Sequence, residues 1–81
     1  MYTVYILKDK NNKYYKGLTN NIVRRLKEHK SGHTITTSKM KDIELIYKEE
    51  YVAFNEARAR EKYFKTAAGR KMLKKLLNMD G

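Results

Sequence analysis

The stretch YYKGLTNNIVRRLKEH, residues 14–29, decides the fold because an aromatic strand switches to a helix within it. Thr19 and Asn20 are candidate caps, since such side chains accept hydrogen bonds from the first free backbone N–H groups of a helix. Arg25 and His29 are four residues apart and therefore share one face of that helix. Arginine binds phosphate oxygens through two parallel hydrogen bonds, and tyrosine or histidine can move a proton. The stretch therefore indicates phosphate chemistry where the strand meets the helix.

A hairpin precedes this switch. The first eight residues, Met1–Lys8, are rich in β-branched and aromatic side chains and predict a strand. Residues 9–13 are turn-forming, because asparagine and aspartate tolerate left-handed geometry, so Tyr14–Thr19 returns as the partner strand. We expect Tyr5 and Tyr15 to lie near each other in this hairpin. From the pattern alone, the two tyrosines can equally be an aromatic pair that only stabilises the sheet.

The rest of the chain predicts a third strand and further helices. The patterns indicate a helix from Ile22 to Ser31-Gly32, a polar loop at His33–Asp42, a strand at Ile43–Val52, a helix at Ala53–Lys65 that Gly69 breaks, and a last helix at Arg70–Asn78. We therefore expect one α+β domain over residues 1–81. It is a small three-stranded antiparallel sheet flanked by helices, in the order β-β-α-β-α-α.

Spacing also predicts local contacts in these later elements. Alternation places Ile43, Leu45 and Tyr47 on one face of the third strand. Glu56 precedes Arg60 by four residues, which suits an ion pair on a helix surface. The apolar residues of the last helix are expected to pack inward: Met72, Leu73, Leu76 and Leu77.

Glu61 interrupts an apolar stripe of the second helix. It shares a face with Ala57 and Phe64, and a carboxylate there is costly unless it is paired or binds a metal. One interpretation is a metal ligand. The other is a glutamate at the edge of the stripe, either solvated or paired with one of three cations: Arg58, Lys62 or Lys65.

The charge of the chain is strongly positive and uneven. The net charge is +10, and residues 1–41 carry ten lysines and arginines against two acidic residues. A basic surface on one half of a small domain favours a polyanionic partner, with nucleic acid ahead of a membrane. There is no cysteine, which excludes disulfides and cysteine metal ligands.

Membrane attachment is not indicated by the sequence. No apolar run approaches the ~20 residues of a membrane span. The N-terminal segment has no positive stretch before its apolar residues, which argues against a signal peptide. We expect a cytoplasmic protein without a membrane partner, and a monomer is favoured.

The residues assembled so far resemble the GIY-YIG nuclease superfamily, in particular its small single-domain bacterial members. The first tripeptide of that pattern is TVY at residues 3–5, and the second is YKG at residues 15–17. The helix that follows supplies Arg25 and His29, and a later helix supplies Glu61. Each tripeptide alone is weak evidence, but five positions at matching spacings along nearly the whole chain form a specific joint signal.

The resemblance implies a metal-dependent endonuclease that hydrolyses DNA phosphodiester bonds, with a structure-selective role in DNA repair or processing. One divalent cation, Mg²⁺ or Mn²⁺, is expected on Glu61, and Arg25 is expected to hold the scissile phosphate. Tyr5, assisted by Tyr15 and His29, is expected to orient and deprotonate the attacking water. The ordinary tyrosine pKa of about 10 is high for this purpose, so clustered positive charge and the metal would have to lower it.

Candidate substrate contacts surround these five residues. Gly17 is expected to let the backbone approach the substrate closely. The full set comprises Lys16, Gly17, Thr19 and Arg24, with Thr37, Ser38 and Lys39 in the polar loop. Two other functions stay open: a basic nucleic-acid-binding module on the same fold that does not cut, and a protein-interaction domain that uses the leucine-rich segment Met72–Met79.

Overall fold

A computed structural model describes residues 1–31 and 42–77 of the chain. In chain order its elements are β1 (Tyr2–Lys8), β2 (Tyr14–Thr19), α1 (Ile22–Lys30), β3 (Glu44–Tyr51), α2 (Phe54–Phe64) and α3 (Ala67–Leu76). The expected α+β architecture and its element order are confirmed.

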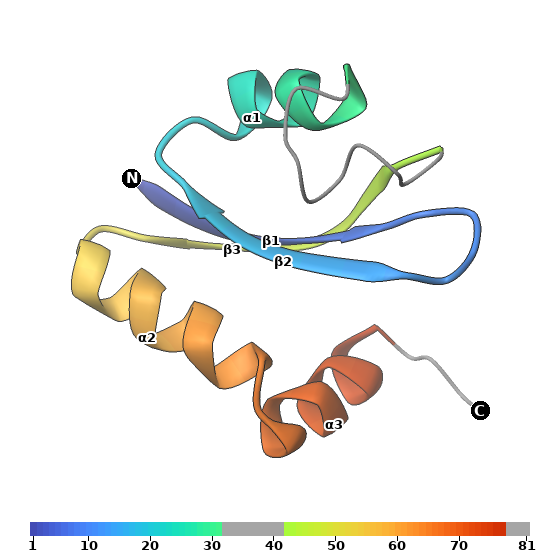
Figure 1. The fold of residues 1–81 in the computed structure, drawn as a ribbon. Helices are drawn as coiled ribbons and strands as arrows, with labels where there is room; N and C mark the ends of the chain where they lie inside the picture. The colour runs from blue at the N-terminus through green and yellow to red at the C-terminus, as the bar shows by residue number, and fades with distance from the viewer. Residues whose placement is uncertain (32–41, 78–81) are drawn as a thin grey trace.

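The three strands form one antiparallel sheet in the order β2-β1-β3, so β1 is the central strand. In Figure 1, α1 lies on one face of this sheet, and α2 and α3 lie on the other. The strand β2 is an edge strand of this sheet.

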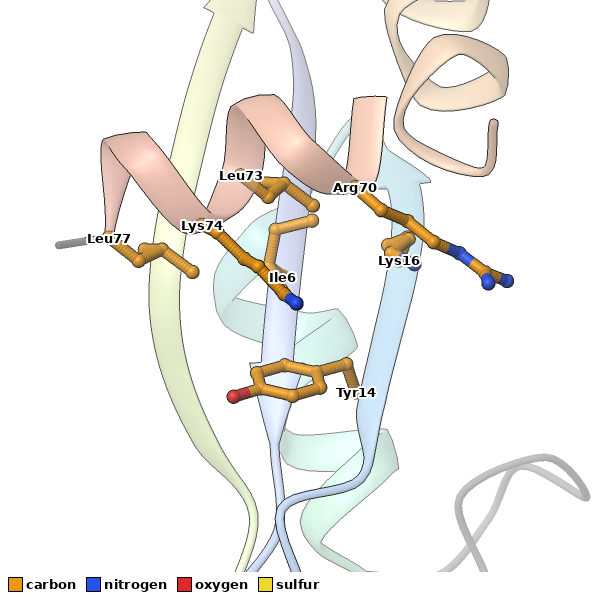
Figure 2. Close-up of a pocket in the computed structure, with 7 residues that line it drawn as sticks. All are labelled: Ile6, Tyr14, Lys16, Arg70, Leu73, Lys74 and Leu77. Atoms are coloured by element: carbon orange, nitrogen blue, oxygen red, sulfur yellow. The ribbon is translucent and has the colours of Figure 1, made fainter. Parts of the chain in front are cut away.

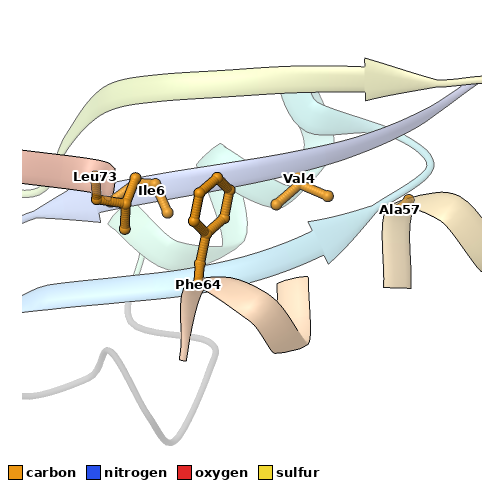
Figure 3. Packing of buried hydrophobic residues seen from close by; sticks show 5 residues of the cluster. All are labelled: Val4, Ile6, Ala57, Phe64 and Leu73. Carbon is orange, nitrogen blue, oxygen red and sulfur yellow. The ribbon is translucent and has the colours of Figure 1, made fainter. Parts of the chain in front are cut away.

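The hydrophobic core lies between the sheet and α2. Figure 3 shows Val4 and Ile6 of β1 directed toward Phe64, with Ala57 and Leu73 completing the cluster. The alternate residues Tyr5 and Leu7 of β1 point to the other face, the one on which α1 lies, and both are fully buried. The central strand is therefore buried on both faces. It supplies most of the buried hydrophobic side chains, as expected for the thin core of a small domain.

A β-bulge changes the faces of β3. Ile6 pairs with Tyr47 and Leu7 pairs with Leu45, so Ile46 is an extra residue on the β3 side. Because directly opposed residues share a face of the sheet, Leu45 lies on the α1 side and Tyr47 on the α2 side. The expectation that these two residues share a face is wrong, since simple alternation does not count the bulge.

The start of α1 differs slightly from the expectation. Asn21, rather than Thr19 or Asn20, is the N-cap, and its side chain accepts a hydrogen bond of 3.1 Å from the backbone N–H of Arg24. The Thr19 hydroxyl instead accepts from the backbone N–H of Asn21 at 3.1 Å. The two side chains together shape the turn that leads from β2 into α1.

The start of α3 also differs from the expectation. Thr66 caps it by accepting a hydrogen bond of 3.0 Å from the backbone N–H of Gly69. Gly69 thus lies inside α3 and does not break a helix. A Cβ at this position would lie 1.9 Å from the carbonyl oxygen of Tyr63, so glycine permits the close approach of α3 to the end of α2.

The apolar residues of α3 pack inward only in part. Leu73 is buried and Leu77 is half-buried, whereas Met72 and Leu76 are exposed.

Within residues 1–31 and 42–77, no helix combines the length and apolar character that crossing a membrane requires.

Candidate active site

Four of the five residues of the motif meet beneath α1. Tyr5 projects from β1, and its Oη lies 2.8 Å from Nε2 of His29 in a buried hydrogen bond. The Nε of Arg25 donates to the same Oη at 3.4 Å. The ring of Tyr15 lies 4.9 Å from the ring of His29 and 6.1 Å from that of Tyr5, measured between centroids. The spacing along β1, β2 and α1 therefore converges on one cluster.

Gly17 packs closely against two tyrosines of the cluster. It lies opposite Tyr5 in the β1–β2 ladder. A Cβ on Gly17 would lie 2.4 Å from Cζ and 2.5 Å from Oη of Tyr5, and 2.8 Å from Cε1 of Tyr15. Glycine at this position therefore makes room for two phenol rings, and its contact with a substrate stays a prediction.

Burial controls protonation in this cluster. Tyr5 is 0% exposed and His29 is 1% exposed. Burial raises the pKa of Tyr5 to about 12, although Arg25 partly offsets the rise. Arg25 thus lowers this pKa as expected, but burial has the larger effect, and lowering by a bound metal stays a prediction. Burial, assisted by the charge of Arg25, lowers the pKa of His29, so both side chains are neutral at pH 7.

Arg25, Tyr5 and His29 form a chain of hydrogen bonds. A guanidinium can only donate, so Arg25 donates to Oη of Tyr5. Nε2 of a neutral His29 accepts from the hydroxyl when the imidazole proton is on Nδ1, and donates to it in the other tautomer. The chain thus runs from Arg25 through Tyr5 to a neutral imidazole.

Arg25 is the part of this chain that reaches solvent. The pKa of Arg25 is raised, and the largest cause is its hydrogen bond to Tyr5. Tyr15 and Glu28 act in the same direction, and burial has a smaller opposing effect. Its Nη1 lies 3.4 Å from Oε1 of Glu28, and 33% of the side chain is exposed. Since its hydrogen bonds to Tyr5 and Glu28 are both long, at 3.4 Å, these two bonds orient the guanidinium without holding it tightly.

Arg25 and Glu61 line the same hollow. This hollow of about 560 Å³ lies at the β2 edge of the sheet, between α1 and α2. It connects two helices that cover opposite faces of the sheet in Figure 1. Its lining comprises Arg24, Arg25 and Glu28 from α1, Leu18, Thr19 and Asn20 from the end of β2, Phe54, Arg58 and Glu61 from α2, and Tyr2 from β1.

Glu61 is mostly buried and has a weak partner. Its side chain is 17% exposed, and its Oε2 lies 3.8 Å from Nζ of Lys65 one turn later. Of the three cations considered from the sequence, the structure selects Lys65. The carboxylate therefore faces the hollow with only a loose ion pair, which leaves its oxygens available to a further cation.

The donor set for a metal in this hollow is sparse. Glu61 and Glu28 are the carboxylates that line it, and Glu28 is paired with Arg25. Within the described part of the chain, no group of three or more histidine or acidic side chains could hold a metal. Mg²⁺ commonly takes one or two carboxylates and completes its shell with water and substrate phosphate, and this donor set fits that pattern.

The remaining expected contacts divide into three groups. Thr19 and Arg24 line the hollow. Lys16 does not, because it pairs with Ile6 and shares the face of the sheet that α2 and α3 cover. Residues 37–39, which contribute Thr37, Ser38 and Lys39, lie outside the described residues.

Sequence reasoning missed Arg58 and Glu28 as parts of the site. Arg58 lies three residues before Glu61 on α2, and Glu28 lies three residues after Arg25 on α1. Residues three apart share a helix face, so this spacing was a usable signal. With Arg58 included, three arginines line the hollow.

The comparisons with known proteins agree with this geometry. Residues 1–75 match the GIY-YIG catalytic domain. The chain is 34% identical over 80 residues to a UPF0213 protein of Limosilactobacillus reuteri (strain DSM 20016), a match that covers 95% of this chain and 83% of that protein. It is 35% identical over 68 residues to the UPF0213 protein YazA of Bacillus subtilis (strain 168), covering 83% and 69% respectively.

The fold is also similar to a solved structure. The solution NMR structure of a UPF0213 protein from Bacillus halodurans superposes with a TM-score of 0.59 at 29% sequence identity. The match covers 94% of this chain and 85% of that one. The family match over residues 1–75 and the small bacterial relatives lead to one conclusion: this chain belongs to the GIY-YIG nuclease family.

Proposed function

We propose that this protein is a divalent-metal-dependent endonuclease that hydrolyses phosphodiester bonds in DNA. One observation carries the proposal: Arg25, which is hydrogen-bonded to the Tyr5–His29 pair, lines the same hollow as Glu61. A phosphate in that hollow would meet a cationic group and an acidic group, and the proton acceptor would lie behind the cationic group that it is hydrogen-bonded to. These are the parts that phosphodiester hydrolysis requires.

The phosphate would bind to the arginines of the hollow. Arg24 and Arg58 are exposed, and Arg25 is held in place by Tyr5 and by the nearby Tyr15. A guanidinium that is oriented before the substrate arrives stabilises developing charge on phosphate oxygens without further reorganisation. Arg25 is therefore the residue that would contact the scissile phosphate.

Glu61 would hold the metal. Its carboxylate lines the hollow and is only loosely paired with Lys65, so a cation can replace the ammonium group. Mg²⁺ or Mn²⁺ held by Glu61 would neutralise charge that develops at the leaving oxygen. Until a metal binds, Lys65 balances the charge of Glu61.

The Tyr5–His29 pair would take the proton of the attacking water. A phenol with a pKa of about 12 is a poor base alone, but Tyr5 can pass its own proton to Nε2 of His29 while its oxygen receives one from water. The resulting hydroxide attacks phosphorus, and the bond to the leaving oxygen breaks. Because Tyr5 is fully buried, water and phosphate must enter past the half-buried Arg25 and Tyr15.

A second candidate function is a nucleic-acid-binding module that does not cut. The burial of Tyr5 and His29 favours it, because no solvent reaches the phenol while the arginines of the hollow are open. This alternative predicts binding that needs no metal and weakens steeply with salt, as expected for neutralised phosphates.

A nicking assay separates the two functions. Supercoiled plasmid and branched DNA are incubated with Mg²⁺ or Mn²⁺ and the wild type, Arg25→Ala, Glu61→Gln or Glu56→Gln. Glu56 is exposed on α2 and does not line the hollow, so Glu56→Gln is the matched control for Glu61→Gln. We expect Arg25→Ala and Glu61→Gln to cut at least about 100-fold more slowly and the control to cut normally.

Two results would overturn the endonuclease proposal. One is the absence of cutting on duplex, flap, junction and single-stranded DNA. The other is equal cutting by the wild type, Arg25→Ala and Glu61→Gln. Salt-dependent binding without any cutting would then support the non-cleaving module.

A further inference from the structure

A second pocket lies on the other face of the sheet, between β2 and α3. It has a volume of about 330 Å³. Figure 2 shows the ring of Tyr14 as one wall, with Leu73 and Leu77 of α3 across from it and Ile6 at the back. The interior is thus apolar and includes an aromatic face, and the volume lies at the small end of the range for ligand sites.

Three cations border this apolar interior: Lys16, Arg70 and Lys74. Among the described residues, none of the three forms an ion pair. Burial lowers the pKa of Lys16, and the positive charges of Arg70 and Lys65 lower it further. The pocket therefore has uncompensated positive charge at its rim, and an anion there would relieve the repulsion.

This chemistry selects a ligand with a flat apolar ring and an attached anion. Single-stranded nucleic acids bind in this way, with bases stacked on aromatic side chains and phosphates on nearby cations. The bases of a duplex are stacked on one another and cannot enter an apolar pocket. The combination of Tyr14 with Lys16, Arg70 and Lys74 therefore suits an unpaired nucleotide.

The edge strand β2 connects this pocket to the hollow. Lys16 borders the pocket and Thr19 borders the hollow, which separates the two sites by roughly 10 Å along a strand with a rise of about 3.3 Å per residue. Lys65 links them electrostatically, because it pairs with Glu61 in the hollow and its charge acts on Lys16. A single nucleic-acid strand that follows β2 would meet both sites.

We propose that the pocket formed by Tyr14, Lys16 and α3 binds the base and phosphate of an unpaired nucleotide. The substrate of this protein then carries a single-stranded segment beside the bond in the hollow. This inference rests on the proposed function of the hollow, and it adds the class of nucleic acid that the protein selects.

Binding without metal tests the proposal. A fluorescent single strand and a blunt duplex of the same sequence are titrated in EDTA, with fluorescence anisotropy as the readout. We expect Tyr14→Leu to weaken single-strand binding by about 5- to 150-fold, the range for loss of one stacked base, and to leave duplex binding unchanged. Tyr14→Phe keeps the ring and is expected to bind like the wild type.

The cations are tested by salt dependence. We expect Lys16→Gln and Lys74→Gln each to reduce the slope of log affinity against log salt by about 0.7 for the single strand. The matched controls are Lys71→Gln and Lys75→Gln, which remove the same charge from exposed positions of α3 that do not line the pocket. The controls are expected to keep the wild-type slope.

Failure of this inference is distinguishable from failure of the proposed function. If Tyr14→Leu weakens single strand and duplex equally, or weakens neither, the pocket does not bind an unpaired nucleotide. If dodecanoate binds the wild type but not Tyr14→Leu, and the single strand is unaffected by the substitution, the pocket takes an amphiphilic carboxylate and the proposal is wrong. The nicking assay with Arg25→Ala and Glu61→Gln reports on the hollow independently.

Discussion

Two regions of this molecule contain the same kinds of side chain and treat them differently. In the Glu49 cluster, which comprises Tyr47, Glu49, Tyr51 and Arg60, one carboxylate accepts hydrogen bonds from both tyrosines and two from the guanidinium. Arg60 donates to it from Nε at 2.9 Å and from Nη2 at 3.2 Å, and Tyr51 donates at 2.6 Å. In the hollow, the hydrogen bonds of Arg25 to Tyr5 and Glu28 are both long, at 3.4 Å.

The charge balance shows why the two regions differ in role. Burial tends to raise the pKa of Glu49, but hydrogen bonds from Arg60 and the two tyrosines outweigh it and lower the pKa. The guanidinium of Arg60 also lies over the ring of Phe64, 4.5 Å from its centroid, in a cation–π contact. In the Glu49 cluster the carboxylate and the guanidinium of Arg60 are paired with each other, and this pair joins β3 to α2. In the hollow, by contrast, arginine side chains remain available to bind an anionic ligand.

The largest expected effect comes from breaking the closed region. Arg60→Ala removes one partner of a mostly buried pair and leaves the carboxylate of Glu49 uncompensated. We expect the free energy of unfolding to fall by about 2–4 kcal/mol, which is measurable by urea denaturation. Arg58→Ala on the same helix is the control, because Arg58 is exposed and is expected to change stability by less than about 0.5 kcal/mol. Equal losses in both variants would remove the distinction between the regions.

Removing single hydroxyl groups sharpens the comparison. Tyr5→Phe leaves Nε2 of His29 without its phenol partner, with an expected cost of about 1–2 kcal/mol and a loss of DNA cutting. Tyr47→Phe leaves Glu49 with three remaining hydrogen bonds, so we expect a cost of about 1 kcal/mol or less and normal cutting. Denaturation and nicking are measured on both variants. Normal cutting by Tyr5→Phe would contradict a role for Tyr5 in proton transfer.

The smallest expected effect is a difference in pH dependence. The pKa of His29 is lowered on folding, so the unfolded chain binds more protons below its ordinary pKa of about 6.5. The contribution of His29 to the free energy of unfolding is therefore fully present above about pH 6.5. It is lost as the pH falls from there through the lowered pKa of His29 in the folded protein. Glu49 has a lowered pKa too, but its contribution is lost only below its ordinary value of 4.5.

Urea denaturation across this pH range is the measurement. We expect His29→Gln to remove the decrease that begins near pH 6.5 and to leave the decrease below pH 4.5 in place. Persistence of the first decrease in His29→Gln would show that another group causes it. Two charged groups act on the pKa of His29: Arg25 lowers it and Glu28 raises it.

The comparison also shows what could be predicted from sequence. The meeting of Tyr5, Tyr15, Arg25 and His29 follows from a period of two along strands and from residues four apart on a helix. The same period of two assigns Lys16 to the face opposite Tyr15, so its separation from the cluster was predictable, whereas the pocket itself also needs α3. These relations are local, and the order of elements is confirmed for the same reason.

Other features could not be predicted because they depend on segments far apart in the chain. The sequence suggested Glu56 as the partner of Arg60, but the structure pairs Arg60 with Glu49, eleven residues away on β3. That pairing needs the register of β3 against β1, and the bulge at Ile46 sets which side chains face α2. The burial of Tyr5, and with it the rise of its pKa, depends on the packing of α1 over the sheet.

The sequence by itself determined the α+β element order and the residues that cluster beneath α1, because strand and helix periodicities are properties of the local chain. Only the tertiary structure decided that Glu61 shares a hollow with Arg25 around the edge of β2, and that Arg60 is closed while Arg25 is open. Those outcomes depend on how distant surfaces pack and on which buried charges find partners. Packing and charge compensation are settled by the folded whole, and no short stretch of sequence contains them.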